Sequence, residues 1–358
     1  MSAACRARFC FVMRLQSTGK VYFCVMEWQM KTELPRALFS IRHSHRLLLL
    51  GSCFTDEMGQ RLQRDKFPCL ANPFGTLYNP ASIAAHLLRC VSRRPYTEAS
   101  PELMRDTATG LWHSWMHHSS FAAPTAEALV ARLNATLEET AGWLSAADVL
   151  FITMGTASVY RLRSIGLLVA NCHKQPDALF QYERLSAVDI VDTWTTLLQL
   201  LHSVRPSLRV VLTVSPVRHS RAGLHGNQLS KAELLLACDA LASRMPELVT
   251  YFPAYEILVD ELRDYRFYAA DMAHPTPQAA DYIYECLCHT FVPPEEQALS
   301  LQCRRIASAL AHRPFHADGA EHQAHLRRQL EAIARLQAAH PTLDFTPEIS
   351  LCNTRLKR

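Results

Sequence analysis

The stretch Gly51-Ser52-Cys53 places two nucleophile-capable side chains directly after a run of four leucines at residues 47–50. Such an uninterrupted apolar run is typical of a strand that is buried on both faces of a parallel sheet. Thr55 is a good N-cap for a following helix, so we expect the strand-turn-helix arrangement that presents a catalytic nucleophile. The N-terminus of that helix would favour negative charge on a thiolate or an oxyanion.

Asp271 and His274 could activate such a nucleophile. They lie three residues apart, in a loop just before Pro277, and proline favours the first position of a helix. Within one turn of chain, the Asp271 carboxylate can accept the Nδ1 hydrogen of His274, which leaves Nε2 free as a general base. The two stretches together predict a catalytic set of Ser52 or Cys53 with His274 and Asp271.

Each stretch also has a purely structural interpretation. Ser52 and Cys53 could be small residues in a tight turn, since buried free cysteines are common. Asp271 could cap the following helix, with His274 as a hydrogen-bonded interior residue.

The pattern around these stretches predicts an α/β fold. Apolar runs typical of strands alternate with segments that have helical spacing, which indicates a mostly parallel sheet with helices on both faces. We expect a three-layer, doubly wound, flavodoxin-like sheet, in which ligands bind beyond the carboxyl ends of the strands. Ser186 and Ser230 are the expected N-caps of two helices. The expected strands cover residues 47–50, 67–71, 149–153, 208–214 and 249–252, and the expected helices cover residues 55–64, 81–91, 125–145, 187–204, 230–243, 277–291 and 323–338.

The chain is expected to have three parts. Residues 31–292 carry the strands and form the main domain, and residues 293–358 form a helical C-terminal extension without strand-like runs. Residues 1–30 are an atypical extension that contains basic residues and a short apolar run, too short to span a membrane. This segment is either a weak signal peptide or the product of an upstream start, with Met30 as the true first residue.

Composition narrows the class of protein. Of 358 residues, 49% are hydrophobic and 20% are charged, which is typical of a globular protein. The net charge of +4 is spread along the chain without a dense Lys/Arg block, so we expect neither nucleic acid nor a membrane surface as a partner. The 12 cysteines are scattered and form no metal-binding or disulfide framework, which favours reduced thiols in a cytoplasmic protein.

These motifs resemble the SGNH (GDSL-type) hydrolase superfamily, whose first block is G-D-S after the first strand and whose last block is D-x-x-H-P. The resemblance to the GSCFA family is closer, because that name spells its N-terminal motif and the chain reads Gly51-Ser52-Cys53-Phe54-Thr55 there, with Thr in place of Ala. The resemblance covers roughly residues 31–340. Further segments similar to that family are Asn72-Pro73-Phe74-Gly75, Tyr78-Asn79-Pro80, Met154-Gly155-Thr156-Ala157, Asn171-Cys172-His173-Lys174, Ser215-Pro216-Val217-Arg218-His219, Ser230-Lys231-Ala232 and Asp264-Tyr265-Arg266.

The resemblance implies a fold and a hydrolase-like site, but it leaves the nucleophile open. In the superfamily register, Cys53 stands at the usual nucleophile position and Ser52 overlies the Asp. The thiol of Cys53 would then be activated by His274 and the helix N-terminus. A shift of the turn by one residue would instead make Ser52 the nucleophile, which is the usual chemistry of the superfamily.

The resemblance also implies an oxyanion hole that is incomplete in this chain. The superfamily uses the backbone N–H of the nucleophile, an N–H of a second-block glycine, which corresponds to Gly75, and a third-block Asn side chain. The third block aligns with residues 155–157, beginning at Gly155, and the Asn is missing. The candidates to replace it are Asn72, Asn79 and Asn171.

Other polar residues suggest ligand contacts. Arg218, His219 and Lys174 could bind an anionic group or a sugar hydroxyl, or could pair with the acidic residues of the segment 260–264. A metal site could be built from histidines and a cysteine, but their spacing matches no ligand pattern, so we expect no metal. Those residues are His113, His117, His118, Cys172 and His173.

The sequence therefore predicts a hydrolase or acyltransferase that acts on a small-molecule or carbohydrate ester and needs no metal or organic cofactor. The alternative is a catalytically inactive descendant that binds a glycan or metabolite in the same cleft. The missing third-block Asn favours the alternative, and the retained pair of Asp271 and His274 favours the enzyme.

Overall fold

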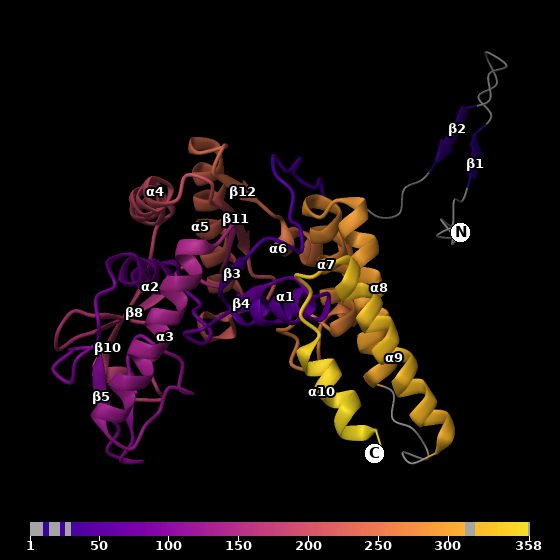
Figure 1. Ribbon diagram of the computed structural model, residues 1–358. Helices are drawn as coiled ribbons and strands as arrows, with labels where there is room; N and C mark the ends of the chain where they lie inside the picture. Colours follow the sequence, from indigo (N-terminus) through magenta and orange to yellow (C-terminus); the bar gives the residue numbers. More distant parts are fainter. Residues whose placement is uncertain (1–9, 14–21, 26–29, 312–318, 357–358) are drawn as a thin grey trace.

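The computed structural model describes residues 10–13, 22–25, 30–311 and 319–356, and its centre is a five-stranded parallel sheet (Figure 1). The strand order is β12-β11-β7-β3-β4. Counted along the chain from β3, this is the flavodoxin-like order 2-1-3-4-5 read from β4. It confirms the predicted three-layer, doubly wound α/β fold. The strands are β3 (Leu47–Gly51), β4 (Cys69–Ala71), β7 (Val149–Met154), β11 (Arg209–Val214) and β12 (Val249–Tyr251).

The leucine run of β3 is buried on both faces, as its composition predicts. Leu48 and Leu50 belong to a cluster with α2 (Pro80–Ser92), α3 (Ala126–Ala146), α4 (Ala187–Val204) and α5 (Gly223–Arg244). Leu47 and Leu49 point the other way, into a cluster with α1 (Cys53–Arg64), α7 (Pro277–Phe291) and the π-helical segment η3 (Ile257–Leu262). Because side chains alternate along a strand, a continuous apolar run supplies both layers of the core.

Short antiparallel strands lie outside the main sheet and were not predicted, because a pattern over so few residues carries little signal. The three-stranded sheet β10-β8-β9 extends from the end of β7, and β5 pairs with β6 in the segment between α2 and α3. A further pair, β1 and β2, lies in the N-terminal extension, of which the remaining residues up to Gln29 are outside the described part of the chain. These strands are β1 (Cys10–Met13), β2 (Tyr22–Val25), β5 (Leu103–Arg105), β6 (Trp112–Ser114), β8 (Ser158–Leu162), β9 (Leu168–Val169) and β10 (Phe180–Arg184).

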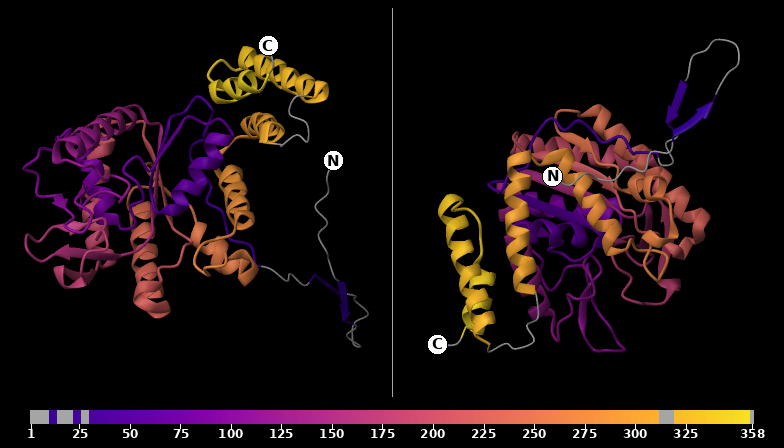
Figure 2. Two further views of the ribbon diagram at one scale, coloured as in Figure 1. Left: turned by 90° about the horizontal axis from the view of Figure 1, so that it is seen from below. Right: turned by 90° about the vertical axis from the view of Figure 1, so that its right-hand side faces the viewer.

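The C-terminal segment is helical and has its own hydrophobic cluster. It consists of α8 (Pro294–Ala311), α9 (Ala320–Ala339) and α10 (Thr346–Arg355), and Figure 2 shows α9 and α10 in yellow beyond α8. Asp65 after α1 accepts hydrogen bonds from Arg304 of α8 at 2.5 and 3.1 Å. The exact division of the chain into domains stays a prediction. No helix in the described ranges is long and apolar enough to cross a membrane.

The starts of three helices test the capping predictions. Ser186 caps α4 in a reciprocal capping box with Asp189, as predicted. Thr55 is not the cap of α1, because the helix begins at Cys53 and Ser52 caps it. Ser230 is not a cap either, since α5 begins at Gly223 and Ser230 lies buried inside it.

Candidate active site

The turn after β3 can only be made with glycine at position 51. Gly51 has φ +150°, and a Cβ atom there would lie 2.3 Å from the carbonyl oxygen of Thr153 in the neighbouring strand. The side chain of Asn72 holds this turn, since its Oδ1 accepts from the N–H of Gly51 at 2.9 Å and its Nδ2 donates to the carbonyl oxygen of Ser52 and to Asp56. The close contact between Gly51 of β3 and Thr153 of β7, together with the bonds of Asn72, therefore holds the turn from which α1 begins.

Ser52 points away from solvent. Its side chain is fully buried, donates to Ser215 Oγ at 2.9 Å and accepts the N–H of Phe54 at 3.3 Å. Both hydrogen bonds are internal, so this hydroxyl acts as a helix cap.

Cys53 is the first residue of α1, and its thiol meets His274. The distance from Cys53 Sγ to His274 Nε2 is 3.3 Å, and His274 Nδ1 lies 2.6 Å from Asp271 Oδ2. This is the nucleophile, base and orienting carboxylate order that nucleophilic catalysis requires. Of the two candidate nucleophiles, the structure brings Cys53 to the histidine.

The loop before α7 fixes His274 through Asp271. Asp271 Oδ1 accepts from the backbone N–H groups of Ala273 and His274 at 2.9 and 3.0 Å. These backbone bonds, with the side-chain bond to His274, hold the pKa of Asp271 well below its usual range, so the carboxylate stays charged. Asp271 does not cap α7, because Thr276 is its N-cap.

The thiol of Cys53 is not pre-ionised. Burial raises its pKa above the ordinary value of 9.0, and the nearby Asp56 carboxylate raises it further. The N–H groups of Cys53 and Phe54 and the charge of Lys231 oppose this shift without reversing it. A reaction at neutral pH therefore needs His274 to remove the thiol proton as the bond to sulfur forms.

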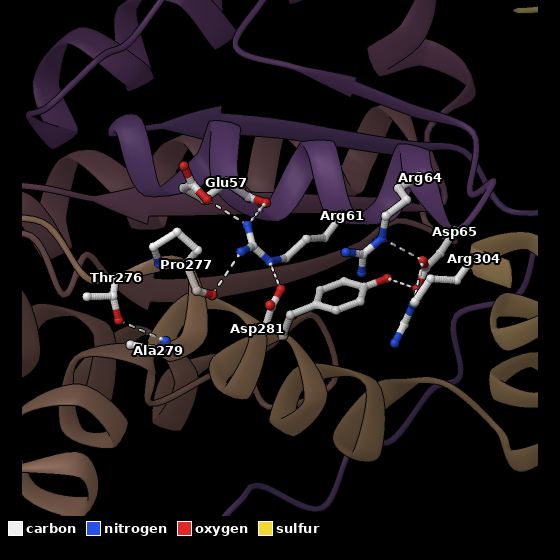
Figure 3. A network of polar contacts seen from close by, with 10 residues as sticks. Glu57, Arg61, Arg64, Asp65, Thr276, Pro277, Ala279, Asp281 and Arg304 are labelled. Atoms are coloured by element: carbon white, nitrogen blue, oxygen red, sulfur yellow. Dashed lines mark hydrogen bonds and ion pairs between the residues drawn. The ribbon is translucent and has the colours of Figure 1, made fainter. Parts of the chain in front are cut away.

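Arg61 ties the helix that carries Cys53 to the helix that follows His274 (Figure 3). Its guanidinium reaches from α1 to the carbonyl oxygen of Pro277 at 3.2 Å and to Asp281 Oδ1 at 2.8 Å, both in the first turns of α7. Its third partner is Glu57, one turn back along α1, at 2.6 Å. This connection holds the relative position of α1 and α7, and so the position of Cys53 relative to His274.

A pocket of about 460 Å³ opens beside Cys53 and His274. It lies at the carboxyl ends of β3 and β7, where the strand order reverses, which is the usual ligand site of such sheets. Tyr160 and Tyr182, from the β8 and β10 strands, form part of its wall, and Arg218, His219 and Arg221 line another part.

Three of the residues predicted to form the oxyanion hole or to bind substrate make internal contacts and do not line the pocket. Gly75 does not line the pocket, and its N–H is donated to the carbonyl oxygen of Asn72. Asn72 holds the β3 turn instead of facing a ligand. Gly155 donates its N–H to the carbonyl oxygen of Tyr78, and a Cβ there would lie 3.0 Å from that oxygen, so it is needed for close packing.

Asn79 is the candidate asparagine that does line the pocket. Its Oδ1 caps α2 by accepting from the N–H of Ser82 at 2.8 Å, which orients the side-chain amide. Asn171, by contrast, lies outside the lining and bonds to Ser119 and to the N–H of His173.

Arg218 and His219 both line the pocket, as their place after β11 suggests. Burial lowers the pKa of His219 to about 4, with the charges of Lys231 and His274 acting in the same direction, so its ring is neutral at pH 7. Lys174 is exposed outside the lining. No group of three or more His, Cys, Asp or Glu in the described residues could hold a metal ion, and His117 is a buried ring packed against Phe74 and His86.

Lys231 is the feature of the site that sequence reasoning missed. It is almost fully buried, and its Nζ donates to the carbonyl oxygens of Gly155 and Ser215 at 2.6 and 2.7 Å, at the ends of β7 and β11. Burial lowers its pKa to about 7. Lys231 shares a helix face with the buried residues Leu234 and Cys238, which was the available signal, because a lysine on a buried face must find polar partners.

Comparison with known proteins places the chain in a family. The family described as "GSCFA family" matches residues 46–287, and the one described as "GSCFA domain protein, C-terminal domain" matches residues 303–358. No curated protein matches the chain. Among solved structures, the chain is similar to an acetyl xylan esterase from the rumen bacterium Butyrivibrio proteoclasticus, with 10% identity and a TM-score of 0.30 over 75% of this chain and 65% of that chain. The chain thus spans less than two thirds of that protein, and the similarity is too low to inform the site.

Proposed function

The chain belongs to the GSCFA family, and from this premise we propose that it is a cysteine-dependent hydrolase or acyltransferase of SGNH type that acts on an ester. The observation that carries the proposal is the contact of 3.3 Å between Cys53 Sγ and His274 Nε2, with Asp271 hydrogen-bonded to the other ring nitrogen. Carbohydrate O-acyl groups are among the candidate substrates.

The first half of the reaction forms a thioester. Cys53 Sγ attacks the acyl carbon while His274 Nε2 takes the thiol proton, and Asp271 stabilises the imidazolium that results. His274 then gives the proton to the leaving alkoxide, which departs as an alcohol. In the second half, His274 takes a proton from water or from an acceptor alcohol, which attacks the thioester and releases the free thiol.

Concerted proton removal suits the raised pKa of Cys53. A thiol that ionises above its ordinary range is protonated at neutral pH, so a stable ion pair with His274 does not form in advance. The general base at Nε2 supplies the deprotonation during the attack.

The oxyanion is held by the N-terminus of α1 and by Asn79. The backbone N–H of Cys53 lies close enough to the thiol to lower its pKa, so it faces the reacting atoms, whereas the N–H of Phe54 is donated to Ser52 Oγ. Asn79 has its oxygen engaged in the α2 cap, which leaves its amide N–H groups for the pocket. This amide takes the part of the third-block Asn that the chain lacks.

Trapping of an acyl-enzyme tests the proposal. The protein is mixed with p-nitrophenyl acetate, quenched in acid within the first turnovers, and analysed by peptide mass spectrometry together with release of p-nitrophenol. We expect an acetyl group on Cys53 and a loss of turnover on the order of 10³-fold in Cys53→Ala and His274→Ala.

The matched control is Cys69→Ala, which removes another partly exposed free thiol outside the pocket. Its turnover per folded molecule should equal that of the parent protein. Turnover that persists in Cys53→Ala, or acetyl groups spread over several cysteines in proportion to their exposure, would contradict the proposal.

The alternative of a non-catalytic binding protein rests on the raised pKa of Cys53. In that case the pocket binds its ligand without a thioester. Saturable protection of Cys53 from alkylation by a glycan or metabolite, with no acyl-enzyme from any activated ester, would favour it.

A further inference from the structure

We propose that this pocket selects acyl substrates that carry an anionic group, a carboxylate or a phosphate, and that Arg218 binds that group. That the bound molecules are substrates rests on the proposed function. The preference of the pocket for anions is a separate property, which can be measured without turnover.

The lining of the pocket is positively charged. Its residues, all within the described part of the chain, include Arg218 and Arg221 but no Asp or Glu. Three carboxylates near the site lie outside the lining, and each has a partner. Asp271 bonds to His274, Asp56 accepts from Asn72, and Asp177 pairs with Arg221. A concave site lined by one sign of charge raises the local concentration of the opposite charge.

Arg218 is held in place without a carboxylate partner. Its guanidinium lies over the ring of Tyr268, 4.1 Å from the centroid, and one N–H donates to the carbonyl oxygen of Met272 at 3.3 Å. The ring of Tyr265 lies farther away, with its centroid 6.0 Å from the guanidinium carbon. No ion pair within 4.0 Å joins Arg218 to an acid in the part of the chain that the structure describes, including the segment 260–264 that sequence analysis offered as a partner.

This geometry suits an anion. Stacking on an aromatic ring orients the guanidinium plane, and the remaining N–H groups form the fork that matches a carboxylate or a phosphate. The backbone N–H of Arg218 donates to the carbonyl oxygen of Ala273 at 3.1 Å, the residue before His274. The fixed guanidinium is therefore tied to the catalytic loop.

Arg221 is the weaker of the two arginines. It pairs with Asp177, and both side chains are more than half exposed, so the pair is worth little and can reorganise around a ligand. It also lies over Tyr160, 4.8 Å from the ring centroid. Arg221 adds positive charge at the rim, and Arg218 provides the defined contact.

Alkylation of Cys53 by a matched pair of reagents tests the inference. Iodoacetate and iodoacetamide both form an S–C bond with the thiolate and release iodide, but only iodoacetate carries a carboxylate. The two rate constants are measured at one pH by peptide mass spectrometry, and their ratio cancels changes in the thiol itself. We expect Arg218→Gln to lower the ratio of iodoacetate to iodoacetamide about tenfold.

The matched control is Arg132→Gln. Arg132 has the same kinds of contact, since it lies 4.6 Å from the ring centroid of Phe121 and donates to the carbonyl oxygen of Ser120 at 2.8 Å, but it is outside the pocket lining. Its ratio should equal that of the parent protein, and Arg218→Lys, which keeps the charge, should retain a ratio above that of Arg218→Gln. Equal ratios in the parent protein and Arg218→Gln would overturn the inference.

A pair of esters separates this inference from the proposed function. Mono-p-nitrophenyl succinate carries a carboxylate on its acyl chain, and p-nitrophenyl butyrate is its neutral counterpart. We expect the succinate to have the lower KM, and Arg218→Gln to raise that KM about tenfold with little change for the butyrate. Turnover of both esters with no Arg218 dependence would refute the anion site alone, whereas an Arg218-dependent alkylation ratio without turnover of either ester would refute the proposed function alone.

Discussion

The two sides of the β3–α1 turn differ sharply although they are one residue apart. On one side lies a buried floor of Ser52, Ser215 and Lys231, whose side chains bond only to one another or to backbone groups. On the other side lies an open mouth of Cys53, His274 and Asp271, in which the His and Asp side chains are about half exposed. The same turn thus combines a structural role with the chemical role that we propose.

The difference shows how a helix start separates neighbours. Successive residues at a helix start point about 100° apart, so the N-cap and the first helical residue face different surroundings. Ser52 at the N-cap turns inward and bonds to α1 and to Ser215 after β11, and Cys53 turns toward the pocket. A polar group that has all its bonds inside the protein is structural, and one left facing a pocket is available for chemistry.

The largest difference between the two sides should appear when the Cys53 thiol and the Ser52 hydroxyl are removed in separate variants. Cys53→Ala should lose turnover of p-nitrophenyl acetate on the order of 10³-fold, because no thioester can form. Ser52→Ala should keep turnover per folded molecule within about threefold, since Ser52 does not line the pocket and loss of a cap acts on stability. The folded fraction of each variant, measured by circular dichroism, normalises the turnover. Loss of turnover in Ser52→Ala with an intact fold would reverse the two roles.

Sequence reasoning could predict the fold and the contact between Asp271 and His274 because both leave local marks in the sequence. The leucine run at residues 47–50 predicts a strand buried on two faces, and the three-residue spacing of Asp271 and His274 predicts their contact. Neither mark decides between Ser52 and Cys53, because that choice depends on where α1 begins. The helix begins at Cys53 with Ser52 as its cap, whereas the sequence suggested Thr55 as the cap.

Contacts between distant segments could not be predicted in this way. Ser230 looks like a cap in the sequence, but its hydroxyl accepts from the N–H of Ala157 at 2.8 Å across the pocket floor. Such tertiary partners override local propensity, and they exist only once the sheet has formed.

The free energy of unfolding should also distinguish substitutions at the buried turn from substitutions at the open mouth, with a smaller effect. Asn72→Ala leaves the buried N–H of Gly51 and the carbonyl of Ser52 without their side-chain partners, so the free energy of unfolding should fall by about 1–3 kcal/mol. His274→Ala removes a half-exposed side chain, and the free energy of unfolding should change by about 0.5 kcal/mol or less. Urea unfolding followed by circular dichroism gives both values. A larger loss in His274→Ala than in Asn72→Ala would mean that the mouth is structural as well.

The smallest predicted effect is that of the Lys231 charge, on the buried side of the turn, on the pKa of Cys53 on the open side. The pKa of Cys53 is raised above the ordinary value of 9.0, so the rate of alkylation by iodoacetamide should keep rising with pH beyond 9, where that of an ordinary thiol would level off.

Lys231 has a pKa of about 7, and its positive charge lowers the pKa of Cys53 only while the lysine is protonated, which is below that pH. In Lys231→Met, alkylation should therefore be about two- to threefold slower than in the parent protein below pH 7, because the thiolate has lost a stabilising positive charge. Above pH 8 the two rate profiles should converge, because the lysine has then lost its proton in the parent protein too. A constant ratio between the two profiles from pH 6 to 10 would mean that the floor acts on the mouth through packing and not through the charge of Lys231.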